Sequence, residues 1–282
     1  MKKLAGLVAL AAACASAPAC AFTWSDTSLG WSYGPDYHEP SLTDAQGNAK
    51  DVGKNTVTFT HADGYTYGTN FFNVDMLLSN SADPASNSNM GATEFYAIYR
   101  HNLSMNAVTH SQAFTWGPLK DLTLDTGFIL GSKNNAFASS KRAIVIGPNF
   151  ELDVPGRWDV ALLYYKENNN NGIVGQRVTF NSTWSIESSW GVPFHVGPLA
   201  ASFEGFLDVV GPKGKDGFGN DTKTELLFRP KVMFDVGALF GHKNAFQVGA
   251  GWEYWVNKYG TNHRTTPGAL QSTPFVTADI HF

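Results

Sequence analysis

The sequence predicts an all-β protein, a twelve-stranded antiparallel transmembrane β-barrel, on three observations. The terminal segment 273–282 alternates apolar and mostly polar side chains and ends on Phe282, an aromatic C-terminus common among bacterial outer-membrane barrels. The N-terminus has the pattern of an export signal. The intervening chain falls into alternating segments bounded by Gly, Pro, Asn and Asp clusters. Alternation gives each strand one apolar and one polar face, as a wall between lipid and a lumen requires.

Residues 1–21 are expected to be a signal peptide, and residues 22–282 the outer-membrane barrel. Lys2 and Lys3 precede a short uncharged apolar run, and the small residues that end at Ala21 resemble a cleavage site. The apolar run is too short to cross a bilayer as a helix. The expected location is therefore the bacterial outer membrane.

The composition argues against several other classes of protein. Aromatic residues make up 13% and charged residues 16% of the chain, against a usual charged share of about 25%. Both cysteines lie in the signal segment, so the exported chain is expected to carry no disulfide and no cysteine metal site. Removing the charges of Lys2 and Lys3 takes the formal net charge from −4 to −6, which argues against a nucleic-acid partner.

Twelve segments are predicted as strands, an even number such as single-chain bacterial barrels have. They are 22–32, 55–62, 69–79, 92–102, 119–131, 141–151, 157–167, 174–187, 198–210, 223–236, 245–256 and 272–282. From a periplasmic N-terminus the connections alternate in length, and the long ones are expected to face outward. The long connections are 33–54, 80–91, 132–140, 168–173, 211–222 and 257–271. Segment 103–118 is too long for a periplasmic turn and receives no assignment.

Alternation sorts the side chains of each strand onto two faces. In 119–131, for example, Leu124 and Phe128 oppose Asp125. Because lipid solvates a charge poorly, the polar faces are expected to line a lumen. The side chains expected outside include Val178, Phe180, Trp184 and Ile186, with Trp158, Trp190, Trp252 and Trp255 in interfacial girdles. A soluble sandwich gives a similar local pattern, but the signal, the missing cysteines, the strand count and the terminal aromatic together favour the barrel.

One run of residues indicates more than a strand, because its particular sequence resembles that of a known family. Residues 61–75 read HADGYTYGTNFFNVD and follow the run DTSLG at 26–30. Shorter matches are DPA at 83–85, GATE at 91–94, YRH at 99–101 and KDGFG at 215–219. With these residues the chain resembles, over nearly its whole exported length, the nucleoside-specific channel-forming outer-membrane proteins, the Tsx/OmpK family. The resemblance implies a monomeric twelve-stranded barrel with a narrow pore for nucleosides, in a family that also includes phage and colicin receptors.

A pore for nucleosides needs rings that stack on a base and polar groups that bind the ribose and the base edges. Stacking contributes roughly 1–3 kcal/mol per base, and weak sites in series let a channel release its cargo. The expected stacking surfaces are Tyr96, Tyr165, Phe206 and Phe275. The expected hydrogen-bonding groups are Asp75, Glu94, Arg100, Glu204, Arg229 and Glu253. The alternative is that these side chains only fill a narrow barrel and close its wall.

Enzymatic activity, a metal site and a cofactor are not predicted. The histidines are scattered, and the sequence has no paired metal-ligand spacing. The leading hypothesis is a channel for passive uptake of nucleosides or similar small polar solutes. The alternative is a receptor or adhesin barrel with little specific transport, and an outer-membrane hydrolase or acyltransferase is a third and weaker hypothesis. The expected partners are nucleosides, outer-membrane lipid and lipopolysaccharide, the barrel-insertion machinery through Phe282, and a phage or colicin.

Overall fold

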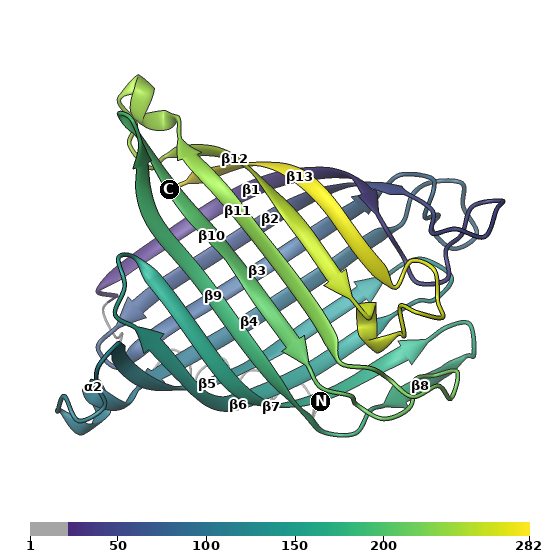
Figure 1. Ribbon diagram of the computed structural model, residues 1–282, viewed down its shortest axis with the longest axis horizontal. Helices are drawn as coiled ribbons and strands as arrows, with labels where there is room; N and C mark the ends of the chain where they lie inside the picture. Colours follow the sequence, from purple (N-terminus) through teal and green to yellow (C-terminus); the bar gives the residue numbers. More distant parts are fainter. Residues whose placement is uncertain (1–21) are drawn as a thin grey trace, which may run out of the picture.

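The computed structural model describes residues 22–282, whose strands close into an antiparallel β-barrel (Figure 1). The expected signal peptide, 1–21, lies outside the described residues. The strands are β1 (Trp24–Tyr37), β2 (Val52–Tyr65), β3 (Gly68–Ser79), β4 (Thr93–Ser104), β5 (Leu119–Lys133), β6 (Ser140–Leu152), β7 (Arg157–Asn171), β8 (Gln176–Thr179), β9 (Thr183–Val196), β10 (Leu199–Val210), β11 (Glu225–Asp235), β12 (Phe246–Val256) and β13 (Leu270–His281). Short helical turns are α2 (Met105–Thr109), η1 (Gly237–Phe240) and η2 (Lys258–Gly260).

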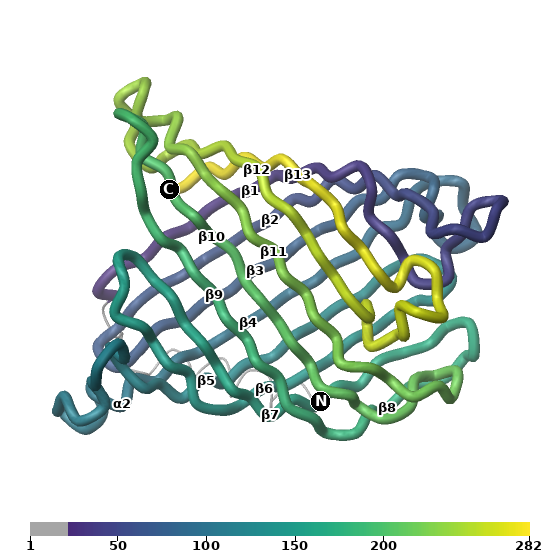
Figure 2. The backbone as a smooth tube through the Cα atoms, viewed as in Figure 1, coloured from purple at the N-terminus to yellow at the C-terminus, as the bar shows by residue number. Residues whose placement is uncertain are grey.

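Twelve of these strands form the barrel wall. Each wall strand pairs with the next one along the chain, β7 pairing with both β6 and β9, and β1 closes the ring against β13. The short strand β8 pairs with the far end of β7 and extends the wall there. Figure 2 shows the strands of the near wall crossing those of the far wall, as tilted strands in a closed cylinder do. The predicted twelve-stranded barrel is therefore confirmed.

Some predicted boundaries are wrong. The predicted strand 174–187 is two strands, because the chain leaves β8 at Phe180 and the backbone N–H of Asn181 donates to the carbonyl of Lys213, 2.9 Å away. The chain then re-enters the wall as β9. The connection predicted at 33–54 is only 38–51, since β1 and β2 are longer than expected.

The unassigned segment 103–118 contains the helical turn α2, at the end of the barrel that has the shorter connections (Figure 1). Ser104 caps this turn, its hydroxyl accepting from the backbone N–H of Ala107 at 3.0 Å. His110 ends it in the left-handed conformation, with φ of 50°. The long connections lie at the opposite end, which we call the long-loop end. Within the described residues, no helix is long and apolar enough to cross a membrane.

Apolar side chains cover the outside of the wall. Those exposed on successive strands include Trp31, Val57, Phe59, Phe95, Leu124, Phe128, Leu130, Ile144, Ile146, Leu162, Tyr164, Trp184, Phe203, Phe228, Trp252, Tyr254, Val276 and Ile280. A ring of exposed apolar surface around a closed sheet is unsuited to water and suited to lipid. The chain is therefore a barrel of the bacterial outer membrane.

Two of the side chains expected outside point inward instead. Phe180 is buried, and the ammonium group of Lys213 lies 4.5 Å from the centre of its ring. Trp255 donates its indole N–H to the carboxylate of Glu225 at 2.8 Å on the lumen side. Both residues lie near strand ends. The strand breaks at Phe180, and Trp255 bonds to an inner carboxylate, so in neither case does the apolar ring determine which side the residue faces.

The terminal aromatic lies where the closing strand meets the first strand. The backbone N–H of Phe282 donates to the carbonyl of Thr27 at 2.9 Å, and its side chain is 72% exposed. Because most of this ring is exposed, we expect its role to lie in assembly.

Deleting Phe282 should lower the amount of inserted protein and leave the conductance of the inserted molecules unchanged. The folded fraction is measured as the fast-migrating band of unboiled samples on denaturing gels. Normal insertion of the shortened chain would contradict this prediction.

Candidate functional site

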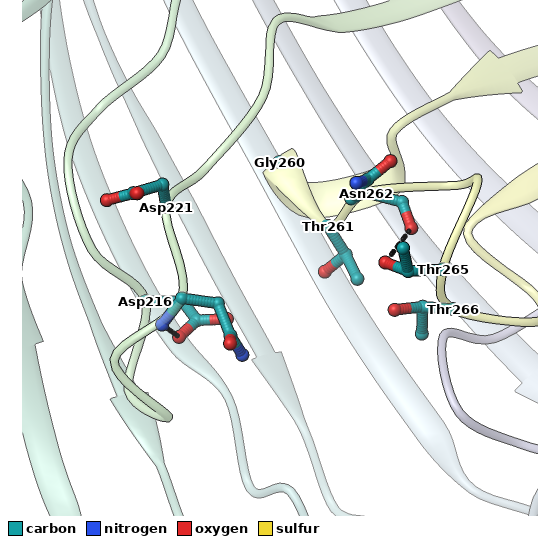
Figure 3. Close-up of a pocket in the computed structure, with 8 residues that line it drawn as sticks. Asp216, Asp221, Gly260, Thr261, Asn262, Thr265 and Thr266 are labelled. Atoms are coloured by element: carbon teal, nitrogen blue, oxygen red, sulfur yellow. Dashed lines mark hydrogen bonds between the residues drawn. The ribbon is translucent and has the colours of Figure 1, made fainter.

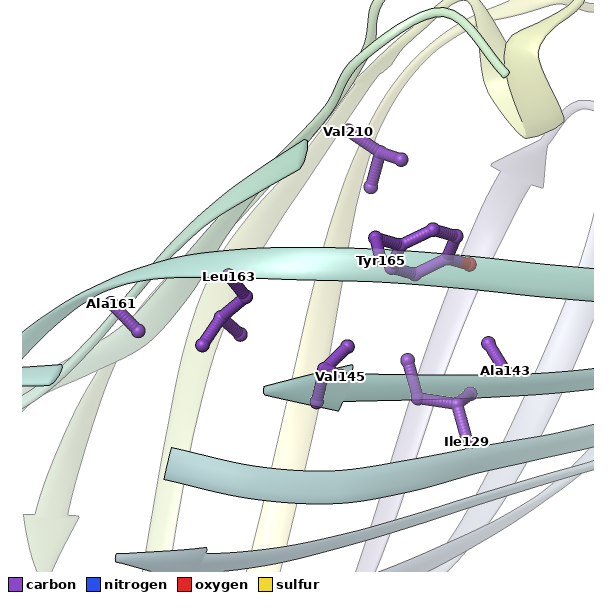
Figure 4. Packing of buried hydrophobic residues seen from close by; sticks show 7 residues of the cluster. All are labelled: Ile129, Ala143, Val145, Ala161, Leu163, Tyr165 and Val210. Carbon is purple, nitrogen blue, oxygen red and sulfur yellow. The ribbon is translucent and has the colours of Figure 1, made fainter. Parts of the chain in front are cut away.

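The lumen is narrowed on one side by an apolar cluster, shown in Figure 4. Its buried members are Ile129, Ala143, Val145, Ala161, Leu163, Tyr165 and Val210, contributed by β5, β6, β7 and β10. Tyr96 and Ile98 of β4 pack against them. Residues of the neighbouring strands β4, β5, β6 and β7 thus share one inner surface with Val210 of β10, which β9 separates from β7. This surface leaves less room for a solute along this part of the wall.

Lys141 of β6 lies beside both tyrosines of this inner surface. Its ammonium group lies 5.5 Å from the centre of the Tyr96 ring and 5.8 Å from that of Tyr165, within cation–π distance. The Tyr165 hydroxyl donates to Glu167 at 2.8 Å. Asp75 pairs with Tyr96 across β3 and β4 and accepts a hydrogen bond from a threonine of β2 at 2.7 Å. Tyr96, Tyr165 and Asp75 therefore all reach the lumen.

A second ring–cation pair lies on β11 to β13. The guanidinium carbon of Arg229 lies 4.3 Å from the centre of the Phe275 ring, and its Nε lies 3.0 Å from Glu253. Glu253 also accepts a hydrogen bond from the amide of Gln271. Three predicted site residues therefore lie in contact with one another: Arg229, Glu253 and Phe275. Alternation predicts that each faces the lumen, but not that they meet.

Arg100 of β4 bridges the lumen. Its Nη2 donates to Glu187 of β9 at 2.7 Å, and its Nε lies 3.9 Å from Asp125 of β5. Along the wall β4 and β9 are separated by β5, β6 and β7, so this contact crosses the interior. Glu187 pairs in register with Asp208 of β10, and Arg100 supplies the positive charge next to these two carboxylates. The bridge restricts the space left for a solute at this level.

The remaining predicted residues lie elsewhere in the lumen. Glu204 is 3.3 Å from the ammonium group of Lys231, which also contacts Asp279 at 3.0 Å, toward the end with the shorter connections. Phe206 pairs in register with Arg229. Glu94 lies 3.8 Å from Lys133 at the long-loop end. The ten predicted residues thus form separate groups along the lumen, and their role in binding solute stays a prediction.

At the long-loop end, the connection between β1 and β2 folds into the mouth of the barrel. Its buried Glu39 contacts three lysines: Lys54, Lys133 at 3.1 Å and Lys258 at 3.4 Å. Lys133 also contacts Asp83 at 2.8 Å. We call Glu39 and these three lysines the mouth cluster. Burial alone would raise the pKa of Glu39, but the ammonium groups of Lys258, Lys54 and Lys133 hold it well below its ordinary value.

The lowered pKa of Glu39 has a defined acid dependence. A carboxylate whose folded-state pKa is depressed contributes stability that is present above its ordinary value of 4.5 and is lost as the pH falls through the lowered pKa. We expect wild type to keep its stability advantage over Glu39→Gln at pH 4.5 and to lose it only in stronger acid. Thermal unfolding of both proteins in detergent, followed against pH, checks this. An advantage already lost above pH 4.5 would contradict it.

A pocket between the two long loops that follow β10 and β12 lies outside the lumen site (Figure 3). Asp216 and Asp221 face Thr261, Thr265 and their neighbours across it. The Asp216 carboxylate accepts the backbone N–H groups of Phe218 and Asn220, at 2.9 and 2.8 Å. Asp216 therefore shapes its own loop, and the pocket adds no group to the lumen site.

Sequence reasoning missed most of the cations that the lumen uses. Three of these cations occupy inward positions of their strands: Lys54, Lys133 and Lys141. Alternation predicts this for Lys54, which is in phase with Thr56 of β2, and for Lys133, which is in phase with Asp125 of β5. Lys213 and Lys258 lie on connections, where no period applies. Lys213 reaches Glu167 at 2.5 Å.

No protein-family model matches the sequence, and no curated protein matches it. Solved structures similar to the chain include the KdgM porin, at 7% identity and a TM-score of 0.43, over 90% of this chain and 99% of that one. The translocator domain of the autotransporter NalP from Neisseria meningitidis is 14% identical with a TM-score of 0.45, over 100% and 96%. OpdK from Pseudomonas aeruginosa, with vanillate, is 8% identical with a TM-score of 0.29, over 92% and 98%. These values indicate nothing about a substrate, and the fold assignment rests on the strand pairing itself.

Proposed function

We propose that this chain is an outer-membrane channel for passive uptake of nucleosides or similar small polar solutes. The observation that carries the proposal is the placement of Lys141 beside Tyr96 and Tyr165 in the lumen. A nucleobase would stack on the same ring faces that the ammonium group now approaches. The likeness of residues 61–75 to the Tsx/OmpK family supports the same solute class.

The energies of the two competing contacts are similar, so a base and the Lys141 ammonium group could exchange on the ring. A cation–π contact contributes about 0.5–1 kcal/mol at exposed sites and about 2 kcal/mol when desolvated. Base stacking on an aromatic side chain contributes roughly 1–3 kcal/mol. A base that displaces Lys141 would therefore gain little net free energy. Weak sites of this kind, repeated at Arg229 and Phe275, suit a channel that must also release its solute.

Single-channel recording in a planar bilayer tests the proposal. We expect a small ion conductance that added nucleosides reduce in a saturable manner, and that ribose alone reduces less, because ribose has no ring to stack. If no nucleoside changes the current, the nucleoside proposal is wrong. A change produced equally by ribose would assign the pore to small polar solutes in general.

The alternative, a receptor or adhesin with little specific transport, is favoured by a specific observation. Arg100 spans the lumen to Glu187, and the mouth cluster fills the long-loop end. A barrel filled at two levels could serve mainly to present its long loops to a phage or colicin. Absence of conductance in fully folded protein, together with binding of such a particle to cells that carry it, would favour this second function.

A further inference from the structure

Three ammonium groups from separate parts of the fold meet at one carboxylate in the barrel mouth. Lys54 comes from β2, Lys133 from β5 and Lys258 from η2, in the connection between β12 and β13. Each of the three lysines is at most 8% exposed. Buried cations are costly unless a negative charge accompanies them, so this group is built around an anion.

The chain supplies that anion from a connection and not from the wall. Among the described residues, Glu39 is the carboxylate within 4.0 Å of Lys54 and of Lys258, whereas Lys133 also has Asp83 and Glu94. Lys258 makes further bonds to neutral acceptors, the carbonyl of His38 at 2.7 Å and the amide oxygen of Gln271 at 3.0 Å. Without the Glu39 carboxylate, two buried ammonium groups would lose their counter-charge.

We infer that Lys54, Lys133 and Lys258 form a binding site for the carboxylate group of a small solute, and that Glu39 occupies this site as the chain's own ligand. The site stands in the mouth, where a solute from the long-loop side would arrive first. Because it binds an anion and nucleosides are uncharged, it goes beyond the proposed function. Withdrawal of the 38–51 connection would exchange the Glu39 carboxylate for that of the solute.

Chemical rescue tests this inference. Glu39→Ala removes a CH2–COO− group, which acetate replaces almost atom for atom. We expect the variant to unfold at a lower temperature than wild type in detergent, and acetate to restore most of the lost midpoint in a saturable manner. Acetamide has the same shape without the charge and should restore nothing. Adding Lys54→Met to the variant should abolish the acetate effect.

Asp51→Ala is the matched control. Asp51 lies on the same connection, is largely exposed, and pairs with His38 at 3.0 Å outside the mouth cluster. Its substitution removes one carboxylate without exposing the lysines, so acetate should leave its midpoint unchanged. Equal effects of acetate and acetamide on Glu39→Ala, or an acetate effect on Asp51→Ala of the same size, would overturn the inference.

A conductance measurement separates this inference from the proposed function. We expect Glu39→Gln, which keeps the side-chain volume, to conduct more than wild type and to prefer anions, because three lysines then face two carboxylates. Wild-type ion preference in a conducting Glu39→Gln channel would overturn the inference. If no variant conducts and acetate still restores the midpoint of Glu39→Ala, the anion site stands and the channel proposal fails.

Discussion

Arg100→Ala is expected to destabilise the barrel by about 3–5 kcal/mol, the usual cost of removing one partner from a buried ion pair. Arg100 is 8% exposed and donates to Glu187 across the lumen. Without it, the carboxyl groups of Glu187 and Asp208, which are paired in register, and that of the nearby Asp125 would lose the cation that lies beside them. Urea unfolding of the lipid- or detergent-reconstituted protein measures the loss.

The same variant should also change conduction. Removing the guanidinium group opens the lumen at the level of the bridge and leaves carboxylates without their counter-charge. We therefore expect a larger single-channel conductance with a stronger preference for cations. Arg142→Ala is the control, because Arg142 is an exposed arginine at an outward position of β6.

A double substitution decides whether charge or packing dominates at the bridge. Arg100→Met fills part of the volume, and adding Glu187→Gln removes one of the two opposed carboxylates. If uncompensated charge is the main cost, the double variant should be more stable than Arg100→Met alone. A double variant no more stable than the single one would show that the cost lies in packing.

The strand pattern could be predicted from the sequence wherever a strand has one polar face. In β13, Thr273, Phe275 and Thr277 are buried and Val276 is half exposed, as the alternation of the last ten residues indicates. The same holds for β5, where Asp125 points inward and Phe128 outward. In these strands the inner environment is polar and the outer one is lipid, so the alternation is enough to predict which side chains face the lumen.

Alternation places Tyr165 of β7 in the lumen, but it gives a weak signal in the middle of β6 and β7, where apolar side chains occupy both faces. Val145 and Leu163 belong to the inner cluster, while Ile144 and Leu162 are exposed outside. A lumen with an apolar wall removes the polar signal that marks the inner face elsewhere. The sequence therefore predicts Tyr96 and Tyr165 in the lumen, but not the apolar cluster that surrounds them.

The mouth cluster was beyond prediction for a different reason. Glu39 and Lys258 are 219 residues apart, and both lie on connections. No period relates such residues, and their meeting depends on how the loops fold after the barrel has closed β1 onto β13. Sequence reasoning could place the long loops at one end of the barrel, but not the charges that they bring into the mouth.

Tyr96→Ala is expected to weaken block of the ion current by nucleosides and to raise the open-channel conductance. Tyr96 packs against the inner cluster beside Lys141, so its removal both widens the lumen and deletes a stacking surface. A full stacking contact of about 1–3 kcal/mol corresponds to a roughly 5- to 150-fold higher half-blocking concentration, and the expected rise lies at the low end of this range because the base must first displace Lys141 from the ring. Nucleoside titration of the single-channel current measures both quantities.

Tyr164→Ala provides the matched control for this prediction. Tyr164 is a tyrosine of β7 on the outer wall, 47% exposed, with its hydroxyl 2.7 Å from that of Ser182. Its removal takes away the same ring from the lipid side, so the current and its block should remain as in wild type. If Tyr96→Ala behaves like Tyr164→Ala, the Tyr96 ring lies away from the solute path, and its packing against the cluster is its whole function. If Tyr96→Ala raises conductance without weakening the block, the ring narrows the pore and the solute stacks elsewhere, with Phe275 beside Arg229 the next ring to substitute.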